Sequence, residues 1–383
     1  MPHLLDAVMA RGWADFGALP FGDPDALALA VIAYLEVGDG CKTAAGLSLR
    51  ETSRGIPADS HGRYSTLLRA MAASRRYADI RICHYANVFS QEEHMQFAAF
   101  CCDVPGVGRV ICFRGTDATI AGWHEDFAML YESPVHSQTA ALLYLQEASL
   151  DTDGPLLLTG HSKGGNLSSY AAAHAEPLIQ NRILCAWSFD GPGLDEATVA
   201  SAGYRNIRPR MRSILPEASF IGLLLGYNTD YLVVRSDGAG MRQHDPFTWL
   251  TKDGELDYTG ETTFYSRVID RTMHDCLDRM EPGSRRAIVD KVFGIVESSG
   301  ARTLPELKTK LLTALPLILL GGETRMDDGM RDTLSDQMRS AVTFGAANAA
   351  SEAVGSLITR ALRRLTGDRG DDSSDDLPAK RPQ

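Results

Sequence analysis

Several features that mark particular classes of protein are missing from this 383-residue sequence. Positive charge is in deficit, because 38 Lys and Arg stand against 49 Asp and Glu, for a formal net charge of −11. This balance disfavours phosphate-rich partners, so we expect no nucleic-acid binding. A membrane-spanning apolar run is also lacking: the longest run, LLTALPLILLGG from residue 311, contains Pro316 and is too short to cross a bilayer.

Paired cysteine motifs are absent as well. The seven cysteines are an odd number, lie in apolar stretches and form no CxxC pair: Cys41, Cys83, Cys101, Cys102, Cys112, Cys185 and Cys276. This distribution favours reduced core thiols over disulfides or a zinc site, so we expect no metal. The N-terminal stretch MPHLLDAVMARGWADFG contains Asp6 and lacks the uninterrupted apolar segment of a signal peptide. We therefore expect a soluble, cytoplasmic protein.

What is present is an ordinary globular composition, with 44% hydrophobic and 23% charged residues. Residues 24–37 predict an opening helix with Asp23 as its cap, and a second helix is expected near residues 63–78. Three strand-like stretches follow, IRICHYANVFS, MQFAAFCCDV and GRVICFRG. The chain therefore begins with helices and then enters a sheet.

After these stretches, helical and strand patterns alternate. Residues 139–150 and 163–175 are helical, and strands are expected within residues 154–160, 182–193, 211–217 and 230–236. Continuous apolar strands separated by helices predict an α/β architecture, in which a mostly parallel sheet is flanked by helices on both faces.

The C-terminal part of the sequence has a different character. Beyond about residue 260 it is helical and charged, and residues 286–298 and 338–365 are amphipathic. We expect a helical cap or C-terminal subdomain there, followed by a disordered tail with almost no apolar residues. The predicted division is 1–260, 261–365 and 366–383.

A serine boxed by glycines follows one of the predicted strands. Gly160-His161-Ser162-Lys163-Gly164 has the G-x-S-x-G pattern of a nucleophile elbow, in which a tight strand-to-helix turn presents the serine. The apolar stretch PLLLTG precedes it and the helical stretch NLSSYAAAHA follows it, as that turn requires. We predict that Ser162 is a nucleophile; a structural loop serine is the alternative. The backbone N–H of Lys163 would supply one oxyanion donor.

A second oxyanion donor has to come from another loop, and residues 111–127, ICFRGTDATIAGWHEDF, offer a strand that ends in Gly-Thr. Strand-F-R-G-T with a later W-x-x-D-F, followed by G-H-S-x-G-G, resembles the class 3 lipases, which are α/β hydrolases. The chain is closer still to a bacterial lipase-like family of unknown function, whose members similarly contain FDGPG and QHDPF motifs. The resemblance covers roughly residues 20–250.

This resemblance implies an α/β-hydrolase fold, lipase-like or esterase-like activity, and no cofactor. It also implies that Thr116, directly after F-R-G, makes the second oxyanion contact through its backbone and hydroxyl. A helix N-cap is an alternative role for Thr116 and is compatible with the first. One departure stands out: where the lipases have a hydrophobic residue after the serine, this chain has Lys163. A cation beside the nucleophile suggests a substrate other than plain triglyceride.

The general base must be a histidine that follows Ser162, because the chain order in this fold is serine, acid, histidine. His174, His244 and His274 satisfy that order. His174 falls on the helix after the elbow, which indicates a surface or packing role. His244 lies in a loop after the last strand-like segment, and it matches the family's Q-H-D-P-F motif. We therefore predict His244 as the base, with His274 as the alternative.

Three residues compete for the role of triad acid. By resemblance, class 3 lipases carry the acid after the strand that MRSILPEASFIG matches here, which makes Glu217 the first choice. Asp190 in FDGPG lies one strand earlier and could instead hold its loop through backbone N–H groups, and Asp237 lies one strand later. Ser219 could also orient the imidazole.

Together these residues predict a serine hydrolase that acts on a small-molecule ester or acyl substrate, without metal or organic cofactor. The sequence leaves open a non-catalytic lipase-like domain that binds an acyl ligand or a partner protein. It also leaves open acyl transfer or thioester cleavage, because both use an acyl-enzyme. Contact of residues 311–365 with a membrane surface is possible but not indicated, and the oligomeric state is undetermined.

Overall fold

The computed structural model describes residues 1–57, 62–117, 119–223, 225, 230–263, 266–267, 279–298, 300–303 and 306–307. His274, Cys276, the amphipathic segment 338–365 and the tail 366–383 lie outside these described residues. The division at residues 260 and 365 therefore stays a prediction.

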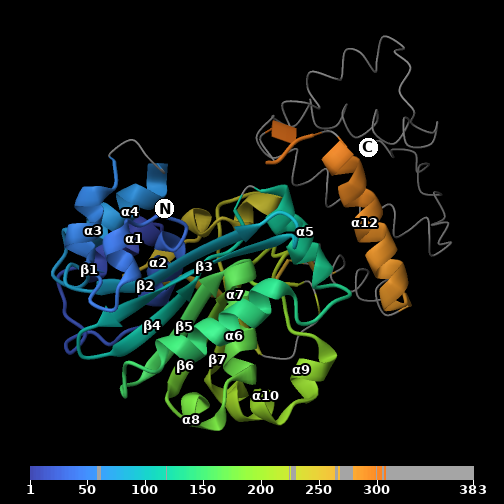
Figure 1. Cartoon of the computed structure of the whole chain (residues 1–383). Helices are drawn as coiled ribbons and strands as arrows, with labels where there is room; N and C mark the ends of the chain where they lie inside the picture. The colour runs from blue at the N-terminus through green and yellow to red at the C-terminus, as the bar shows by residue number, and fades with distance from the viewer. Residues whose placement is uncertain are drawn as a thin grey trace, which may run out of the picture.

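A mixed sheet forms the centre of the molecule (Figure 1). Its strand order is β1-β2-β3-β4-β5-β6-β7-β8-β11, and neighbours from β4 to β8 are parallel while the pairs at both ends are antiparallel. The bounds are β1 (Leu47–Ser48), β2 (Arg81–Ser90), β3 (Met95–Val104), β4 (Gly108–Phe113), β5 (Leu156–His161), β6 (Ile183–Phe189), β7 (Met211–Pro216), β8 (Tyr231–Val234) and β11 (Tyr258–Thr259). A separate pair is formed by β9 (Thr251–Lys252) and β10 (Glu255–Leu256).

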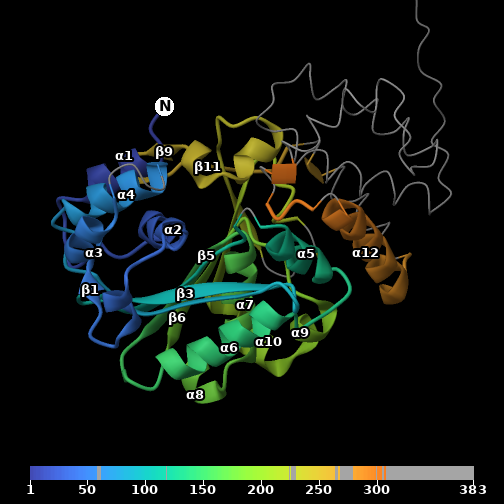
Figure 2. The same ribbon diagram turned by 45° about the horizontal axis from the view of Figure 1, so that its top comes forward.

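Helices cover both faces of this sheet (Figures 1 and 2). One face carries α1 (Leu4–Arg11), α2 (Asp23–Ile32), α3 (Leu49–Gly55) and α4 (Gly62–Ala72). The other carries α6 (His136–Ala148), α7 (Lys163–His174), α8 (Pro177–Gln180), α9 (Glu196–Ala200) and α10 (Ala202–Ile207). Short 3-10 turns are η1 (Asp39–Lys42), η2 (Arg208–Arg210), η3 (Gly240–His244) and η4 (Pro246–Thr248). The predicted α/β architecture is confirmed.

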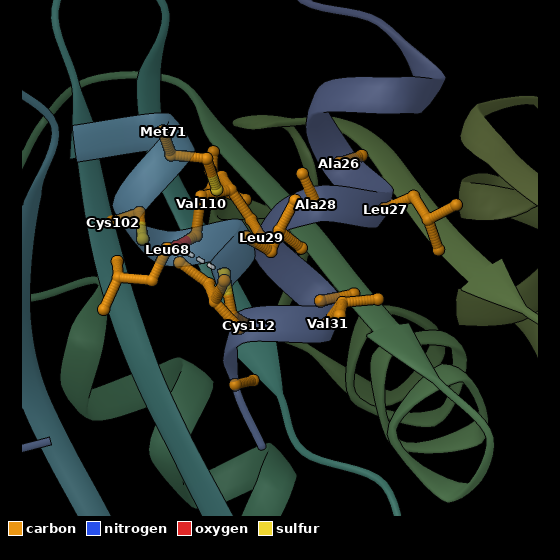
Figure 3. Packing of buried hydrophobic residues seen from close by; sticks show 14 of the residues in the cluster. Ala26, Leu27, Ala28, Leu29, Val31, Leu68, Met71, Cys102, Val110 and Cys112 are labelled. Atoms are coloured by element: carbon orange, nitrogen blue, oxygen red, sulfur yellow. Dashed lines mark hydrogen bonds between the residues drawn. The ribbon is translucent and has the colours of Figure 1, made fainter. Parts of the chain in front are cut away.

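Alternation along the strands sorts the core into two layers. On β4, Val110 and Cys112 join the cluster under α2 and α4, whereas Ile111 and Phe113 join the cluster under α6 and α7. Successive side chains of a strand point to opposite faces, so an uninterrupted apolar strand supplies both layers. Figure 3 shows the first layer, in which Leu29 of α2 lies near Leu68 and Met71 of α4. The described cysteines are free thiols, as predicted, and all but the half-buried Cys185 are buried.

The opening helix differs from its prediction in two ways. Helix α2 ends at Ile32 instead of Val37, and its N-cap is Gly22. Asp23 does not cap the helix, because its carboxylate accepts hydrogen bonds from Trp187 Nε1 at 2.8 Å and from Arg212 Nε at 2.5 Å. Trp187 of β6 and Arg212 of β7 therefore bind the Asp23 carboxylate, which the local sequence predicts as the helix cap.

Two further helices pack together beside one end of the sheet (Figure 2). They are α5 (Ile120–Ala128) and α12 (Pro282–Ser298), and α12 covers the predicted helical segment 286–298. Phe127 and Phe293 belong to one apolar cluster, with ring centroids 5.8 Å apart. In the ranges that the structure describes, no helix is long and apolar enough to cross a membrane.

Candidate active site

Ser162 occupies a strained turn between β5 and α7. Its backbone has φ 58° and ψ −133°, a conformation that favours glycine. The flanking glycines are required by close packing: a Cβ on Gly160 would lie 2.1 Å from the carbonyl carbon of Gly164, and one on Gly164 would lie 2.2 Å from the Phe113 oxygen. The G-x-S-x-G spacing is therefore a steric requirement of this turn.

Two side chains form a hydrogen-bonded series with Ser162. His244 Nε2 lies 2.9 Å from Ser162 Oγ, and His244 Nδ1 lies 2.6 Å from Asp190 Oδ2. A carboxylate oxygen only accepts, so Nδ1 carries the proton and Nε2 is left to accept from the serine hydroxyl. Asp190 is fully buried, whereas the His244 side chain is 22% exposed. This arrangement can activate a serine oxygen.

Parallel strand pairing brings Asp190 to this site. Strand β6 is the direct neighbour of β5, so the residue that follows β6 lies beside the elbow. Asp190 turns there with φ 48°, and its Oδ1 accepts from Ser219 Oγ at 2.5 Å and from Gly222 N at 3.1 Å. Three donor atoms therefore hold the carboxylate, counting the Nδ1 of His244.

The acid that the resemblance favoured occupies a different place. Glu217 follows β7, one strand further from the elbow, and its Oε2 accepts from Ser236 N at 3.4 Å. Asp237 pairs with His3 Nε2 at 2.8 Å on the surface. The order of preference is therefore corrected: the geometry brings Asp190 to His244, and Ser219 reaches the imidazole only through Asp190.

Of the two alternative bases, His174 makes its contacts with other residues. His174 stacks on Tyr170, with centroids 4.2 Å apart, and its Nε2 lies 3.0 Å from Thr198 Oγ1. Burial lowers the pKa of His174, as expected for a packing histidine. His274 lies outside the described residues.

His161, which the sequence analysis did not single out, supports the base. Its Nε2 donates to the His244 carbonyl oxygen at 2.8 Å, and the two rings lie 4.6 Å apart. Tyr34 therefore donates to Nδ1, at 3.0 Å. Burial, and next the neighbouring His244, hold the pKa of His161 well below 6.5, so this donor is neutral. Its position next to the nucleophile was the available signal.

The F-R-G-T loop lies against the elbow. A Cβ on Gly115 would lie 2.5 Å from the carbonyl oxygen of His161, so the close approach requires glycine. Thr116 Oγ1 donates to Asp126 Oδ2 at 2.5 Å. Burial raises the pKa of Asp126 to about 6, against the opposing effects of Lys163 and the Thr116 hydrogen bond. The N-cap role falls to Thr119 instead, whose side chain accepts from Gly122 N.

Lys163 does not present its charge to a substrate. Its side chain is fully buried, and Nζ lies 2.9 Å from Glu125 Oε2 and 2.8 Å from the Gln96 carbonyl oxygen. The ammonium is paired inside the protein, so it gives no reason to expect a substrate other than plain triglyceride. Its backbone N–H is the first of α7, a position without an intrahelical acceptor.

A second motif, FDGPG, is tied to the elbow helix. Asn166 Nδ2 donates to the Gly193 oxygen at 2.6 Å, and Gln138 Nε2 donates to Asn166 Oδ1 at 2.9 Å. The Asn that follows G-H-S-K-G-G thus holds the loop that carries Asp190. As for metals, the described part of the chain contains no group of three or more His, Cys, Asp or Glu that could bind one.

The profile of one protein family, described as Mbeg1-like, matches residues 71–294, which span the elbow, Asp190 and His244. The chain belongs to the Mbeg1-like family. Among solved structures, this Mbeg1-like chain is similar to the crystal structure of M37 lipase, at 15% identity and a TM-score of 0.35. That match covers 67% of this chain and 81% of the other. No curated protein matches the chain.

Proposed function

We propose that this chain is a serine hydrolase with an α/β-hydrolase fold, which cleaves a carboxylic ester through an acyl-enzyme on Ser162, as lipases and esterases do. The observation that carries the proposal is the series Ser162, His244 and Asp190, whose links measure 2.9 and 2.6 Å. The strained turn at Ser162 adds support, because strain of this kind persists where the surrounding structure holds a functional group in place.

The first half of the reaction forms the acyl-enzyme. Ser162 Oγ attacks the ester carbonyl carbon while His244 Nε2 takes the serine proton. Asp190 stays ionised and stabilises the imidazolium through Nδ1–H. The N–H groups of Lys163 and Thr116 hold the oxyanion. The Thr116 hydroxyl donates to Asp126 and thereby holds the loop that presents the Thr116 N–H. Collapse of the tetrahedral intermediate transfers the proton from His244 to the leaving alcohol.

Deacylation reverses these proton transfers. Water gives a proton to His244 Nε2 as its oxygen attacks the acyl carbon, and the second intermediate collapses by expelling Ser162 Oγ. The serine regains its proton from the imidazolium and the carboxylic acid leaves. His161 holds the His244 backbone in place through both halves of the reaction, because its Nε2 donates to the His244 carbonyl oxygen. Its low pKa keeps the ring neutral, so no extra positive charge lies beside His244.

The test is intact-mass analysis after treatment with a fluorophosphonate. We expect one adduct on the wild-type chain, and none on Ser162→Ala or His244→Ala. His174→Ala is the matched control, because that histidine packs on Tyr170, and it should be labelled like the wild type. A folded wild-type chain that forms no adduct would contradict the proposal and favour a lipase-like domain that binds an acyl ligand without cleaving it.

The acceptor of the acyl group is then measured separately. We expect p-nitrophenyl butyrate to yield butyric acid in the presence of competing alcohols or thiols, because water is the proposed acceptor. Esters or thioesters as the main product would instead identify an acyltransferase.

A further inference from the structure

The backbone and the side chain of Lys163 lie in different surroundings. Its backbone N–H follows the nucleophile and is one proposed oxyanion donor. Its side chain runs into the interior, where Nζ contacts Glu125 Oε2 at 2.9 Å and the Gln96 oxygen at 2.8 Å. The side chain has no exposed surface, and that of Glu125 is 3% exposed. One residue thus joins α7 to both α5 and β3.

The partners of Lys163 hold the loop that carries Thr116. Gln96 Oε1 accepts a hydrogen bond at 3.3 Å from the backbone N–H of Asp117, the residue directly after Thr116. Glu125 precedes Asp126, which accepts from the Thr116 hydroxyl at 2.5 Å. Lys163 Nζ also lies 3.8 Å from Asp126 Oδ1. Both the backbone and the hydroxyl of the Thr116 region are therefore tied to groups around the buried ammonium.

Glu125 is itself fixed from more than one side. Its Oε1 accepts from Ser137 N at 2.8 Å at the start of α6, and its Oε2 accepts from Gln96 N at 3.2 Å. Because breaking a buried pair leaves a charge without a partner, α5 cannot move away from α7 without a large cost. The ion pair is thus a rigid link between the two sides of the site.

We propose that the Lys163 side chain is a positioning group that sets the spacing between the two oxyanion donors, its own N–H and Thr116. The inference rests on the acyl-enzyme mechanism proposed above. It accounts for a buried lysine directly after the nucleophile, where the lipases that the chain resembles have an apolar residue. Stabilisation of an oxyanion depends steeply on donor placement, and an error of about 1 Å can cost 100-fold in rate.

The first experiment compares Lys163→Met with the double variant Lys163→Met/Glu125→Gln. For p-nitrophenyl butyrate we expect Lys163→Met to lower kcat about 10- to 100-fold and to leave KM within about threefold. The double variant removes the unpaired carboxylate, so its Tm should recover while kcat stays low. Recovery of both Tm and kcat would overturn the proposal, because the lysine would then serve stability alone.

A second readout does not depend on activity. Amide hydrogen exchange in peptides from residues 114–128 should become faster in Lys163→Met, and unchanged exchange would overturn the proposal. Arg109→Met is the matched control: Arg109 is a buried cation that pairs with Asp103 at 2.7 Å, at the opposite end of β4. It should leave exchange in 114–128 and kcat unchanged. Missing fluorophosphonate labelling would refute the hydrolase itself, and exchange would still decide whether Lys163 holds the loop.

Discussion

Asp190 joins two hydrogen-bond networks through one buried carboxylate. Its Oδ2 faces His244, and its Oδ1 accepts from Ser219 and from the backbone of Gly222. Glu217 has a longer side chain and lies after the next strand, where it bonds Ser236 instead. Which carboxylate contacts His244 is therefore decided by which strand end adjoins the elbow.

Asp190→Asn should lower kcat about 1,000- to 10,000-fold, because the amide no longer holds His244 in the tautomer that accepts the serine proton. Glu217→Gln, the matched control, should stay within about threefold of the wild type. Steady-state hydrolysis of p-nitrophenyl butyrate measures both. A larger loss in Glu217→Gln than in Asp190→Asn would return the acid role to Glu217.

Asp126 makes stability depend on pH. Its pKa is about 6 in the folded chain and 3.8 in the reference state, so the folded state binds more protons between these values. Stability from this group is fully present below pH 3.8 and is lost as pH rises through 6. Asp126→Asn removes that dependence, so its stability relative to the wild type should rise by about 2 kcal/mol between pH 4 and pH 7. Urea unfolding at both pH values measures this. A variant-to-wild-type difference that falls with pH would contradict the assignment.

The elbow at the end of β5 shows how one element imposes strain on one residue. Ser162 N donates to the Phe189 oxygen at 2.9 Å, and Gly165 N donates to the Ser162 oxygen at 2.8 Å. These bonds hold Ser162 at positive φ while the adjacent glycines allow Phe113 and Gly164 to meet. The conformation of Ser162 raises the local backbone free energy, and the surrounding hydrogen bonds maintain it and hold Oγ in place.

Ser162→Gly should therefore be more stable than Ser162→Ala. Both variants lose the bond to His244, but only glycine adopts this backbone conformation without strain. Because glycine also has a more disordered unfolded state, we expect a net difference of about 1 kcal/mol. Urea unfolding midpoints give the comparison, and an alanine variant that is equally stable would mean that the turn is relaxed.

At the scale of the molecule, a third apolar cluster joins α12 to α5, apart from the two layers of the sheet. Phe293 is 4% exposed and packs on Phe127 and on His124, whose ring centroid lies 4.8 Å away. Arg285 Nη1 donates to the Leu130 oxygen at 3.1 Å beside this cluster. Phe293 and Arg285 therefore contact residues on or beside α5, the helix that carries Asp126. These contacts join residues that are more than 150 positions apart in the sequence.

Phe293→Ala should loosen this cluster without unfolding the sheet. Loss of a buried phenyl ring costs about 3 kcal/mol locally, so amide exchange should accelerate in α5 and α12 and stay slow in β5. Phe100→Ala, in the first core layer, is the matched control and should accelerate exchange throughout. Equal acceleration in β5 and α12 for Phe293→Ala would show that the cluster unfolds together with the sheet.

The sequence by itself determined the elements and the elbow, because both depend on neighbours along the chain. Apolar runs such as GRVICF indicated strands, and the glycines around Ser162 indicated a turn that only small residues permit. It also selected His244 for the place that the structure gives it beside Ser162.

Only the tertiary structure decided which distant side chains meet. The resemblance to class 3 lipases points to Glu217 after β7, whereas the sheet order places β6, and with it Asp190, directly beside β5. The sequence also does not show whether a charge is buried. It places the Lys163 cation beside the nucleophile, whereas in the structure the ammonium is buried and paired with Glu125. In both cases the deciding quantity is a distance between elements. Sheet order and helix packing set that distance, because they bring together residues that no local pattern connects.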